Sequence, residues 1–371
     1  MSFSDFHRYD ANEFYTGKGD RLGKKENMTV CKCHHNDLDW VVVKVFKRRL
    51  NLFGILPKDE NEGFRIMLHE AEKIKMFDHE NIIRLYGVLK WPGFGGIALE
   101  IAECGDLGGF LGSTVYVPDI PWWLRQRMLL ELFQALRYLH NYSDTKSVAH
   151  GNVSSRNILL TRKLTVKLSN IQGTRDISEG GDVFENRIHV LESPEHQKLL
   201  DIYSASHVAY EIITRRILTA AEYGYLTSLG HRATNFAQLE ENLGGNDVDI
   251  SIFNKMKDTV IKCGSTNEAE RPDANAAFRM LSQGNLDFYG EKSSEEALFI
   301  AKQYSYYQPQ MASVKKPLDV AFRAKTKEDP KEVTQYPFLH TLNEDNSRPT
   351  FCSPILTHSK LPSWPSANCN P

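Results

Sequence analysis

The chain has 371 residues, of which 41% are hydrophobic and 25% are charged. This composition is typical of a globular protein and excludes a chain too polar to bury a core. The formal net charge of −2 gives no overall attraction to nucleic acid or to an anionic membrane.

The cysteines and the apolar runs narrow the class of protein further. Six cysteines at irregular spacing do not indicate a disulfide framework. No apolar run approaches the ~20 residues that a membrane-spanning helix needs. The first eight residues lack the basic start of a signal peptide, and no apolar core follows them. We therefore expect a cytoplasmic protein, although the cytoplasmic part of a longer receptor would have the same features.

The first part of the chain predicts strands. Residues 1–20 are polar and without clear periodicity, and we interpret them as a lead-in. Leu22 to Cys33 is predicted to form a two-stranded hairpin with its turn at Lys24 to Asn27. Trp40 to Phe46 is rich in β-branched residues, which predicts a buried strand with Lys44 inside it.

Helical periodicity then alternates with a further strand. Apolar residues at helical spacing predict a helix over Glu62 to Met76, with Glu70 on it. Gly96 to Glu103 is predicted to be a strand that leads into a connecting segment. Trp122 to His140 carries one apolar stripe and should be a long core helix. The residues of that stripe are Leu124, Met128, Leu129, Leu132, Phe133, Leu136 and Leu139.

The stretch from Val148 to Asn170 contains the most informative pattern. It reads His150-Gly151-Asn152-Val153-Ser154-Ser155-Arg156-Asn157 and continues into the apolar run Ile158-Leu159-Leu160. Later in the chain come Ser193-Pro194-Glu195, Asp201 and Arg271, followed by predicted helices at about 250–263 and 273–283. Beyond Gly284 the composition shifts to Pro, Ser, Asn, Lys and Glu, which favours a mostly disordered tail with one short helix near Glu295 to Tyr304.

Taken together, these motifs resemble a protein kinase domain. The catalytic loop of that family reads H-R-D-L-x-x-x-N, and this chain has the same skeleton at His150 to Asn157. Lys44 matches the lysine of V-A-I-K, and Ser193-Pro194-Glu195 matches A-P-E, whose glutamate pairs in the family with an arginine at the position of Arg271. The sequence around His150 is most similar to the pseudokinase domains of Janus-type tyrosine kinases. It is almost as similar to other tyrosine-kinase-like pseudokinases.

The resemblance implies a two-lobed α+β fold with a small antiparallel β lobe that carries one helix, and a larger, mainly helical lobe. We expect this domain at residues 21–284, between the lead-in at 1–20 and the tail at 285–371. It also implies a nucleotide site in which Lys44 pairs with Glu70 and Leu99 stands at the back of the adenine pocket. The residues assigned to this site by resemblance are Gly23, Val30, Val42, Lys44, Glu70, Leu99, Glu100, Ala102 and Leu159.

The family's catalytic carboxylates are missing from these positions. Asn152 occupies the slot of the general-base aspartate, and an asparagine cannot take a proton from a hydroxyl group. Asn170 occupies the slot of the metal-binding aspartate, and Asn157 alone remains of the metal-binding residues. Lys25 and Met28 stand where the phosphate loop has glycines, and Val42 crowds the adenine pocket.

We therefore expect a catalytically impaired domain that is not an enzyme and acts as a scaffold or an allosteric regulator. ATP binding should be weak or independent of metal, and Mg²⁺ should not be held firmly. The expected partners are other signalling proteins, among them an active kinase, with neither nucleic acid nor a membrane span. One alternative is an atypical active kinase that uses Lys44 and Asn157. Another sets the resemblance aside and places a metal at Cys31, Cys33, His34 and His35.

Overall fold

The structure is a computed structural model, and each statement below concerns the residues that it describes. These residues are 6–17, 20–24, 28–47, 62–91, 94–142, 148–171, 175–176, 194–219, 222, 236, 239–240, 243, 246–283, 290–306 and 316–323.

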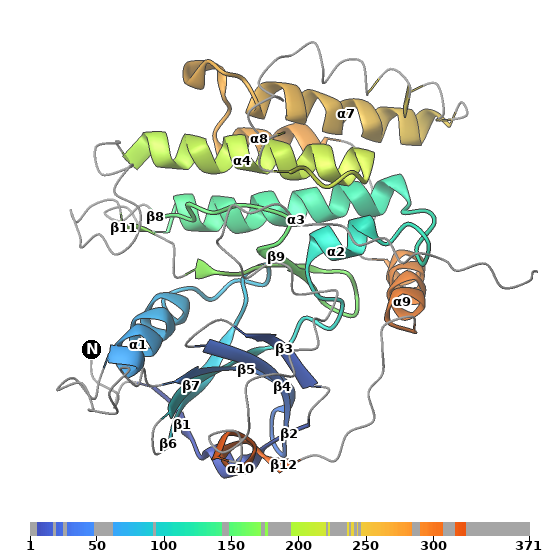
Figure 1. Ribbon diagram of the computed structural model, residues 1–371. Coiled ribbons are helices and arrows are strands. Elements are labelled where there is room, and N and C mark those ends of the chain that lie inside the picture. The colour runs from blue at the N-terminus through green and yellow to red at the C-terminus, as the bar shows by residue number, and fades with distance from the viewer. Residues whose placement is uncertain are drawn as a thin grey trace, which may run out of the picture.

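The small lobe is built on an eight-stranded sheet, which lies in the lower half of Figure 1. The strands follow the order β1-β6-β7-β5-β4-β2-β12, and β3 pairs with β4. Their bounds are β1 Arg8–Tyr9, β2 Phe14–Thr16, β3 Arg21–Lys24, β4 Met28–His35, β5 Asp39–Lys47, β6 Leu85–Trp91, β7 Phe94–Glu100 and β12 Lys316–Pro317. The predicted hairpin is confirmed by the antiparallel β3–β4 pair, and the predicted buried strand is β5.

Helix α1 (Glu62–Lys75) packs against one face of this sheet. Strand β4 shows why the sheet has two different faces, since its residues alternate strictly between half-buried and buried positions. Cys31 and Cys33 belong to a core on the face away from α1, together with the alternate valines of β5. The other face joins the main core of the molecule, which continues into the large lobe.

The N-terminal segment is part of this lobe, which corrects its interpretation as a lead-in. Strand β1 pairs in parallel with β6, and β2 pairs with β4. Between them lies the 3₁₀ helix η2 (Ala11–Glu13), which is capped by reciprocal hydrogen bonds between Asp10 and Glu13. Phe14 is fully buried in the core that contains Cys31 and Cys33, which we call the outer core. The segment is therefore held by backbone pairing and by packing, neither of which its short polar sequence signals.

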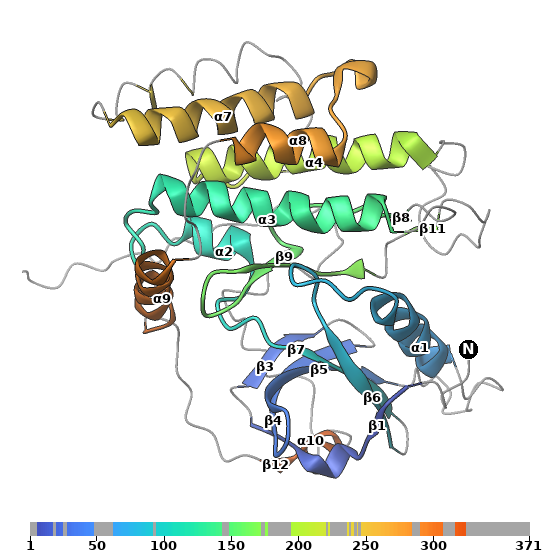
Figure 2. The ribbon, with the colours of Figure 1, turned by 180° about the vertical axis from the view of Figure 1, so that it is seen from behind.

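The large lobe consists of helices that lie nearly parallel to one another in Figures 1 and 2. Helix α3 occupies the predicted range, and every residue of its predicted stripe is fully buried. None of the helices that the structure describes is both long enough and apolar enough to cross a membrane. The helix bounds are α2 Leu107–Gly112, α3 Trp122–His140, α4 Pro194–Thr214, α7 Asp247–Cys263, η5 Glu268–Glu270 and α8 Ala274–Ser282.

The chain between α3 and α4 forms two short antiparallel ladders. They are formed by β9 (Ile158–Leu160) with β10 (Val166–Leu168), and by β8 (Val148–Ala149) with β11 (Arg175–Asp176). The first ladder joins the two lobes, because Leu168 exchanges backbone hydrogen bonds with the segment that follows α1. By position, the segment from Ile171 to Glu192 resembles an activation loop, and most of it, residues 172–174 and 177–192, lies outside the described residues.

Helix α4 overturns the predicted pair between Glu195 and Arg271. The helix begins at Pro194 and runs on through Asp201 without an intervening loop, so that Glu195 lies on its exposed first turn. There the Glu195 carboxylate accepts a hydrogen bond from Lys198 Nζ at 3.1 Å. Arg271 instead donates to the carbonyl oxygen of Ser265 at 2.8 Å and lies over the ring of Tyr203.

The segment beyond residue 284 is also more ordered than its composition predicts. Helix α9 (Glu291–Tyr306) contains the predicted short helix and packs beside the large lobe, and β12 and α10 (Leu318–Arg323) return to the small lobe. Tyr304, at the end of the predicted short helix, is 1% exposed. Residues 324–371 lie outside the described residues. The two-lobed α+β architecture is confirmed, and the segments packed on it extend beyond the expected limits of 21–284.

Candidate nucleotide-binding site

The alternation of β5 decides which of its side chains lie on the face of the sheet that joins the main core. Val41, Val43 and Val45 are fully buried in the outer core. Val42 and Lys44 point to the opposite face, where Val42 packs against the main core. Val30 lies opposite Lys44 in the neighbouring strand and is half-buried. The structure thus brings Val30, Val42 and Lys44 to one surface, as the resemblance implies.

Lys44 and Glu70 form a direct ion pair across this surface. Lys44 Nζ lies 2.5 Å from Glu70 Oε1, and the two side chains are 17% and 2% exposed. The other carboxylate oxygen of Glu70 is buried without a hydrogen-bond partner. The pair lies between α1 and β5 and is largely shielded from water. Lys44 remains partly exposed.

The other residues assigned to the site lie at the end of β7, where the connection between the lobes begins, and in β9. Leu99 pairs with Val42 and is 4% exposed, so it is buried in the main core beside Val42. Glu100 turns to the outside, where its carboxylate lies 2.8 Å from Lys167 Nζ. Leu159 is half-buried on the large-lobe side.

Backbone hydrogen bonds fix this connection to strand β9. Cys104 N donates to Leu160 O at 2.9 Å, and Leu160 N donates to Gly105 O at 2.8 Å. Gly105 has φ of 70° and donates to the carbonyl oxygen of Ala102. Gly23 of β3 is buried and pairs with Val30. Lys25, in the turn of this hairpin, lies outside the described residues.

The loop that follows β8 is organised by a buried carboxylate on α4. Asp201 is 1% exposed and accepts three hydrogen bonds. Its Oδ2 accepts from His150 N at 2.7 Å and lies 3.0 Å from His140 Nε2, and its Oδ1 accepts from Gly151 N at 2.8 Å. Because two of the donors are backbone amides of the loop, Asp201 fixes the loop's path. The sequence pattern included Asp201 but did not predict this role.

His150 connects the loop to the segment that leads to Asn170. Its Nδ1 accepts from Asn152 N at 3.3 Å, and its Nε2 lies 2.9 Å from Ser169 O. A carbonyl oxygen can only accept, so the proton is assigned to Nε2 of a neutral ring. Burial lowers the pKa of His150, which favours the same neutral form.

Asn157 lies between the two altered positions. Its side-chain Nδ2 donates to the carbonyl oxygen of Asn152 at 2.7 Å, and its own carbonyl oxygen accepts from Ser169 N at 2.8 Å. The Asn152 side chain is exposed, and Asn170 is half-buried with φ of 65°, a left-handed conformation that asparagine tolerates better than most residues. The skeleton of the loop is therefore complete, while the two carboxylate positions hold amides.

The donor atoms at this place do not suit a magnesium ion. Asn157 and Asn170 offer only neutral carbonyl oxygens, whereas Mg²⁺ in proteins favours carboxylates. In the parts of the chain that the structure describes, no three Asp, Glu, His or Cys side chains come together as a metal site.

The alternative metal site in β4 is not assembled either. His34 lies on the opposite face of the strand from Cys31, Cys33 and His35. Burial raises the pKa of the Cys33 thiol, which disfavours the thiolate that would bind a metal.

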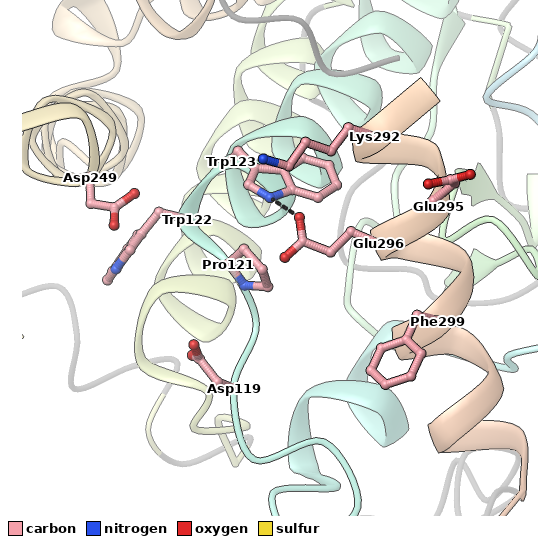
Figure 3. Close-up of a pocket in the computed structure, with 9 residues that line it drawn as sticks. All are labelled: Asp119, Pro121, Trp122, Trp123, Asp249, Lys292, Glu295, Glu296 and Phe299. Carbon is pink, nitrogen blue, oxygen red and sulfur yellow. Dashed lines mark hydrogen bonds between the residues drawn. The ribbon is translucent and has the colours of Figure 1, made fainter. Parts of the chain in front are cut away.

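A separate open pocket of about 680 Å³ lies on the large lobe. Figure 3 shows its lining, in which side chains of α9 face the start of α3 and the first turn of α7. Trp123 Nε1 donates to Glu296 Oε2 there at 3.0 Å. None of the residues assigned to the nucleotide site lines this pocket.

Comparison with known proteins gives relatives at low identity. Probable serine/threonine-protein kinase kinX of Dictyostelium discoideum is 27% identical over 240 residues, covering 62% of this chain and 20% of the relative. Receptor-interacting serine/threonine-protein kinase 2 of Bos taurus is 27% identical over 283 residues, covering 69% and 48%. Guanylyl cyclase C of Sus scrofa is 27% identical over 261 residues, covering 67% and 23%.

The matched region accounts for less than half the length of each of these relatives. Their names do not support the Janus-type grouping. The sequence pattern of the protein tyrosine and serine/threonine kinase family matches residues 18–281, close to the predicted limits of 21–284. Because this match spans more than half of the chain, the protein belongs to the protein tyrosine and serine/threonine kinase family.

Proposed function

We propose that this chain is a catalytically impaired kinase-like domain that acts in signalling by binding other proteins, as a scaffold or as an allosteric regulator. The observation that carries the proposal is the contrast within one loop. Asp201, His150 and Asn157 hold its backbone in place, while the two positions that need carboxylates, 152 and 170, hold asparagine.

The loss of the base removes proton transfer from the reaction. A kinase needs a group that accepts the proton of the substrate hydroxyl, and a positioned base contributes about 10²–10⁴-fold to rate. The amide of Asn152 can accept a hydrogen bond but not a proton.

Loss of the metal-binding carboxylate acts on a different step. Phosphoryl transfer depends on metal ions that neutralise charge on the phosphates. Asn157 already uses its side-chain amide hydrogen to hold the loop, and Asn170 carries no charge. The two defects therefore compound, since one removes the base and the other weakens charge neutralisation.

Nucleotide binding itself is compatible with the site. Lys44 is partly exposed beside Glu70 and could meet a phosphate, and Val30, Val42 and Leu159 could contact an adenine ring. Val42 and Leu99 narrow the space for the base. We propose weak ATP binding that does not depend on Mg²⁺.

The relatives are consistent with both a binding role and a catalytic one. Two of them are named as serine/threonine kinases, whereas guanylyl cyclase C and a U-box domain-containing protein of Arabidopsis thaliana carry names that describe no protein kinase. The alternative, an atypical active kinase, is favoured by one observation, the intact Lys44–Glu70 pair at 2.5 Å.

Transfer of labelled phosphate from ATP separates the two functions. We expect the purified chain to transfer no more phosphate, to itself or to a generic protein substrate, than its Lys44→Met variant does. Restoring both carboxylates with Asn152→Asp and Asn170→Asp should raise transfer if the loop skeleton is otherwise competent. Transfer by the unmodified chain that Lys44→Met abolishes would instead establish the alternative.

A further inference from the structure

The segment at residues 316–323 lies on the small lobe, although it follows all the helices of the large lobe in sequence. Figure 2 shows β12 and α10 against the sheet, and α9 beside the helices of the other lobe. A short stretch of chain, residues 307–315, joins the two. The same C-terminal segment therefore contacts both lobes.

The small-lobe contact combines strand pairing with apolar packing. Strand β12 pairs with the edge of β2, with Lys316 opposite Thr16 and Pro317 opposite Tyr15. Leu318 and Phe322, one helical turn apart, are 0% and 2% exposed in the outer core. The Phe322 ring lies 5.7 Å from Phe94 and 6.4 Å from Trp91. The segment thus covers a sheet edge and an aromatic surface that would otherwise face water.

The large-lobe contact is made by α9. Tyr304 is 1% exposed and packs its ring 5.1 Å from Phe110 of α2. At the other end of the helix, Glu296 accepts the hydrogen bond from Trp123 that is drawn in Figure 3. These contacts anchor the segment before it crosses to the small lobe.

The small-lobe contact is made by a short segment. It consists of the two-residue strand β12 and the short helix α10, with Leu318 and Phe322 buried and Ala321 packed against the same core. Helix α10 has six residues, far below the ~12–15 at which an isolated helix becomes stable, so it depends on the sheet for its structure. Tethering supplies an effective concentration on the order of millimolar, which can hold such a contact without making it permanent.

We propose that residues 316–323 are a reversible latch, docked in cis on the outer face of the small lobe, that restrains the two lobes relative to each other. Release of the latch would free the lobes to move and expose the edge of β2 together with Trp91 and Phe94. The latch involves neither nucleotide nor the residues of the altered loop, so it stands or falls independently of the proposed function.

Single-molecule energy transfer in the full chain tests the latch. Dyes on unnatural amino acids at Asn36 of the small lobe and Val248 of the large lobe, both exposed, would report the distance between the lobes. Phe322→Asp places a charge in the outer core and should lower the docking constant about 100-fold or more. Val320→Asp is the matched control, because Val320 is 44% exposed on the same helix.

We expect a narrow distance distribution for the unmodified chain and for Val320→Asp, and a broad one for Phe322→Asp. Amide exchange at residues 14–16 of β2 should rise at least about 10-fold in Phe322→Asp alone, because β12 no longer covers that edge. Unchanged distances and unchanged exchange in a folded Phe322→Asp chain would overturn the proposal.

A cut chain provides a test that leaves every packed residue intact. A specific protease site inserted within residues 307–315 allows the latch to be severed after folding. Cleavage should broaden the distance distribution, because the docked residues then no longer connect the small lobe to α9. No effect of cleavage would overturn the latch. So would energy transfer between separately labelled copies of the uncut chain, because the segment would then dock on a second copy.

Discussion

Replacing Asp201 should destabilise the protein more than any change at the exposed positions of the altered loop. The carboxylate is 1% exposed and accepts from His150 N, Gly151 N and the His140 ring at 2.7–3.0 Å. Asp201→Ala leaves the buried amide of His150 and the partly buried amide of Gly151 without their acceptor, at about 1–3 kcal/mol for each buried group, and also removes the bond to His140. The sum is a loss of about 4 kcal/mol in the free energy of unfolding. For a domain of this size, that lowers Tm by roughly 10 °C.

Chemical denaturation followed by circular dichroism would measure this loss. Asp201→Asn keeps one acceptor oxygen and should lose about half as much stability, because its NH₂ group faces a donor. Asp258→Ala, at an exposed position on α7, is the control and should stay within about 0.5 kcal/mol of the unmodified chain. If Asp201→Ala lowers the free energy of unfolding by less than about 1 kcal/mol, Asp201 is not the residue that holds the loop.

Three further outcomes follow from other contacts. Lys44→Met should cost about 2 kcal/mol of stability by leaving the Glu70 carboxylate buried and unpaired, and the double variant Lys44→Met/Glu70→Leu should recover most of it in the same denaturation assay. Burial raises the pKa of Glu211 from 4.5 to about 7. As pH rises from 4.5 to 7, Glu211 loses its proton in the unfolded chain before it does in the folded chain, so the free energy of unfolding falls. Glu211→Gln should therefore be more stable than wild type by about 1–3 kcal/mol at pH 8, with a difference that shrinks toward pH 4.5; an equal difference at both pH values would exclude this titration. A double-mutant cycle between Glu195→Ala and Arg271→Ala should give a coupling energy near zero, whereas about 1 kcal/mol or more would restore the predicted pair.

Local patterns in the sequence were sufficient for the core of each lobe. The β-branched run around Lys44 and the apolar stripe of α3 reflect burial that repeats along one element, so periodicity predicts them. The positions of Lys44, Glu70 and the His150 loop follow from motif order, and the structure brings Lys44 and Glu70 into contact.

What the sequence could not predict depends on contacts between distant segments. Strands β1 and β12 have only two residues each, too few for any periodicity, and pairing with the sheet defines them. That Asp201 receives three hydrogen bonds follows from how α4 lies against β8, which composition does not reveal. The Glu195–Arg271 prediction failed for a similar reason, because α4 continues through Glu195 as one helix and turns that side chain to solvent.

The proposed function rests on a site that retains a lysine for phosphate and lacks the carboxylates that hold a metal. Thermal unfolding of the full chain in increasing ATP, with and without Mg²⁺, tests it most directly, since a ligand that binds only the folded state raises Tm. We expect a small rise in Tm at millimolar ATP that is the same in both series and is lost in Lys44→Met. A rise that grows severalfold on adding Mg²⁺ would contradict it, because a metal would then be held at Asn157 and Asn170 despite their neutral side chains.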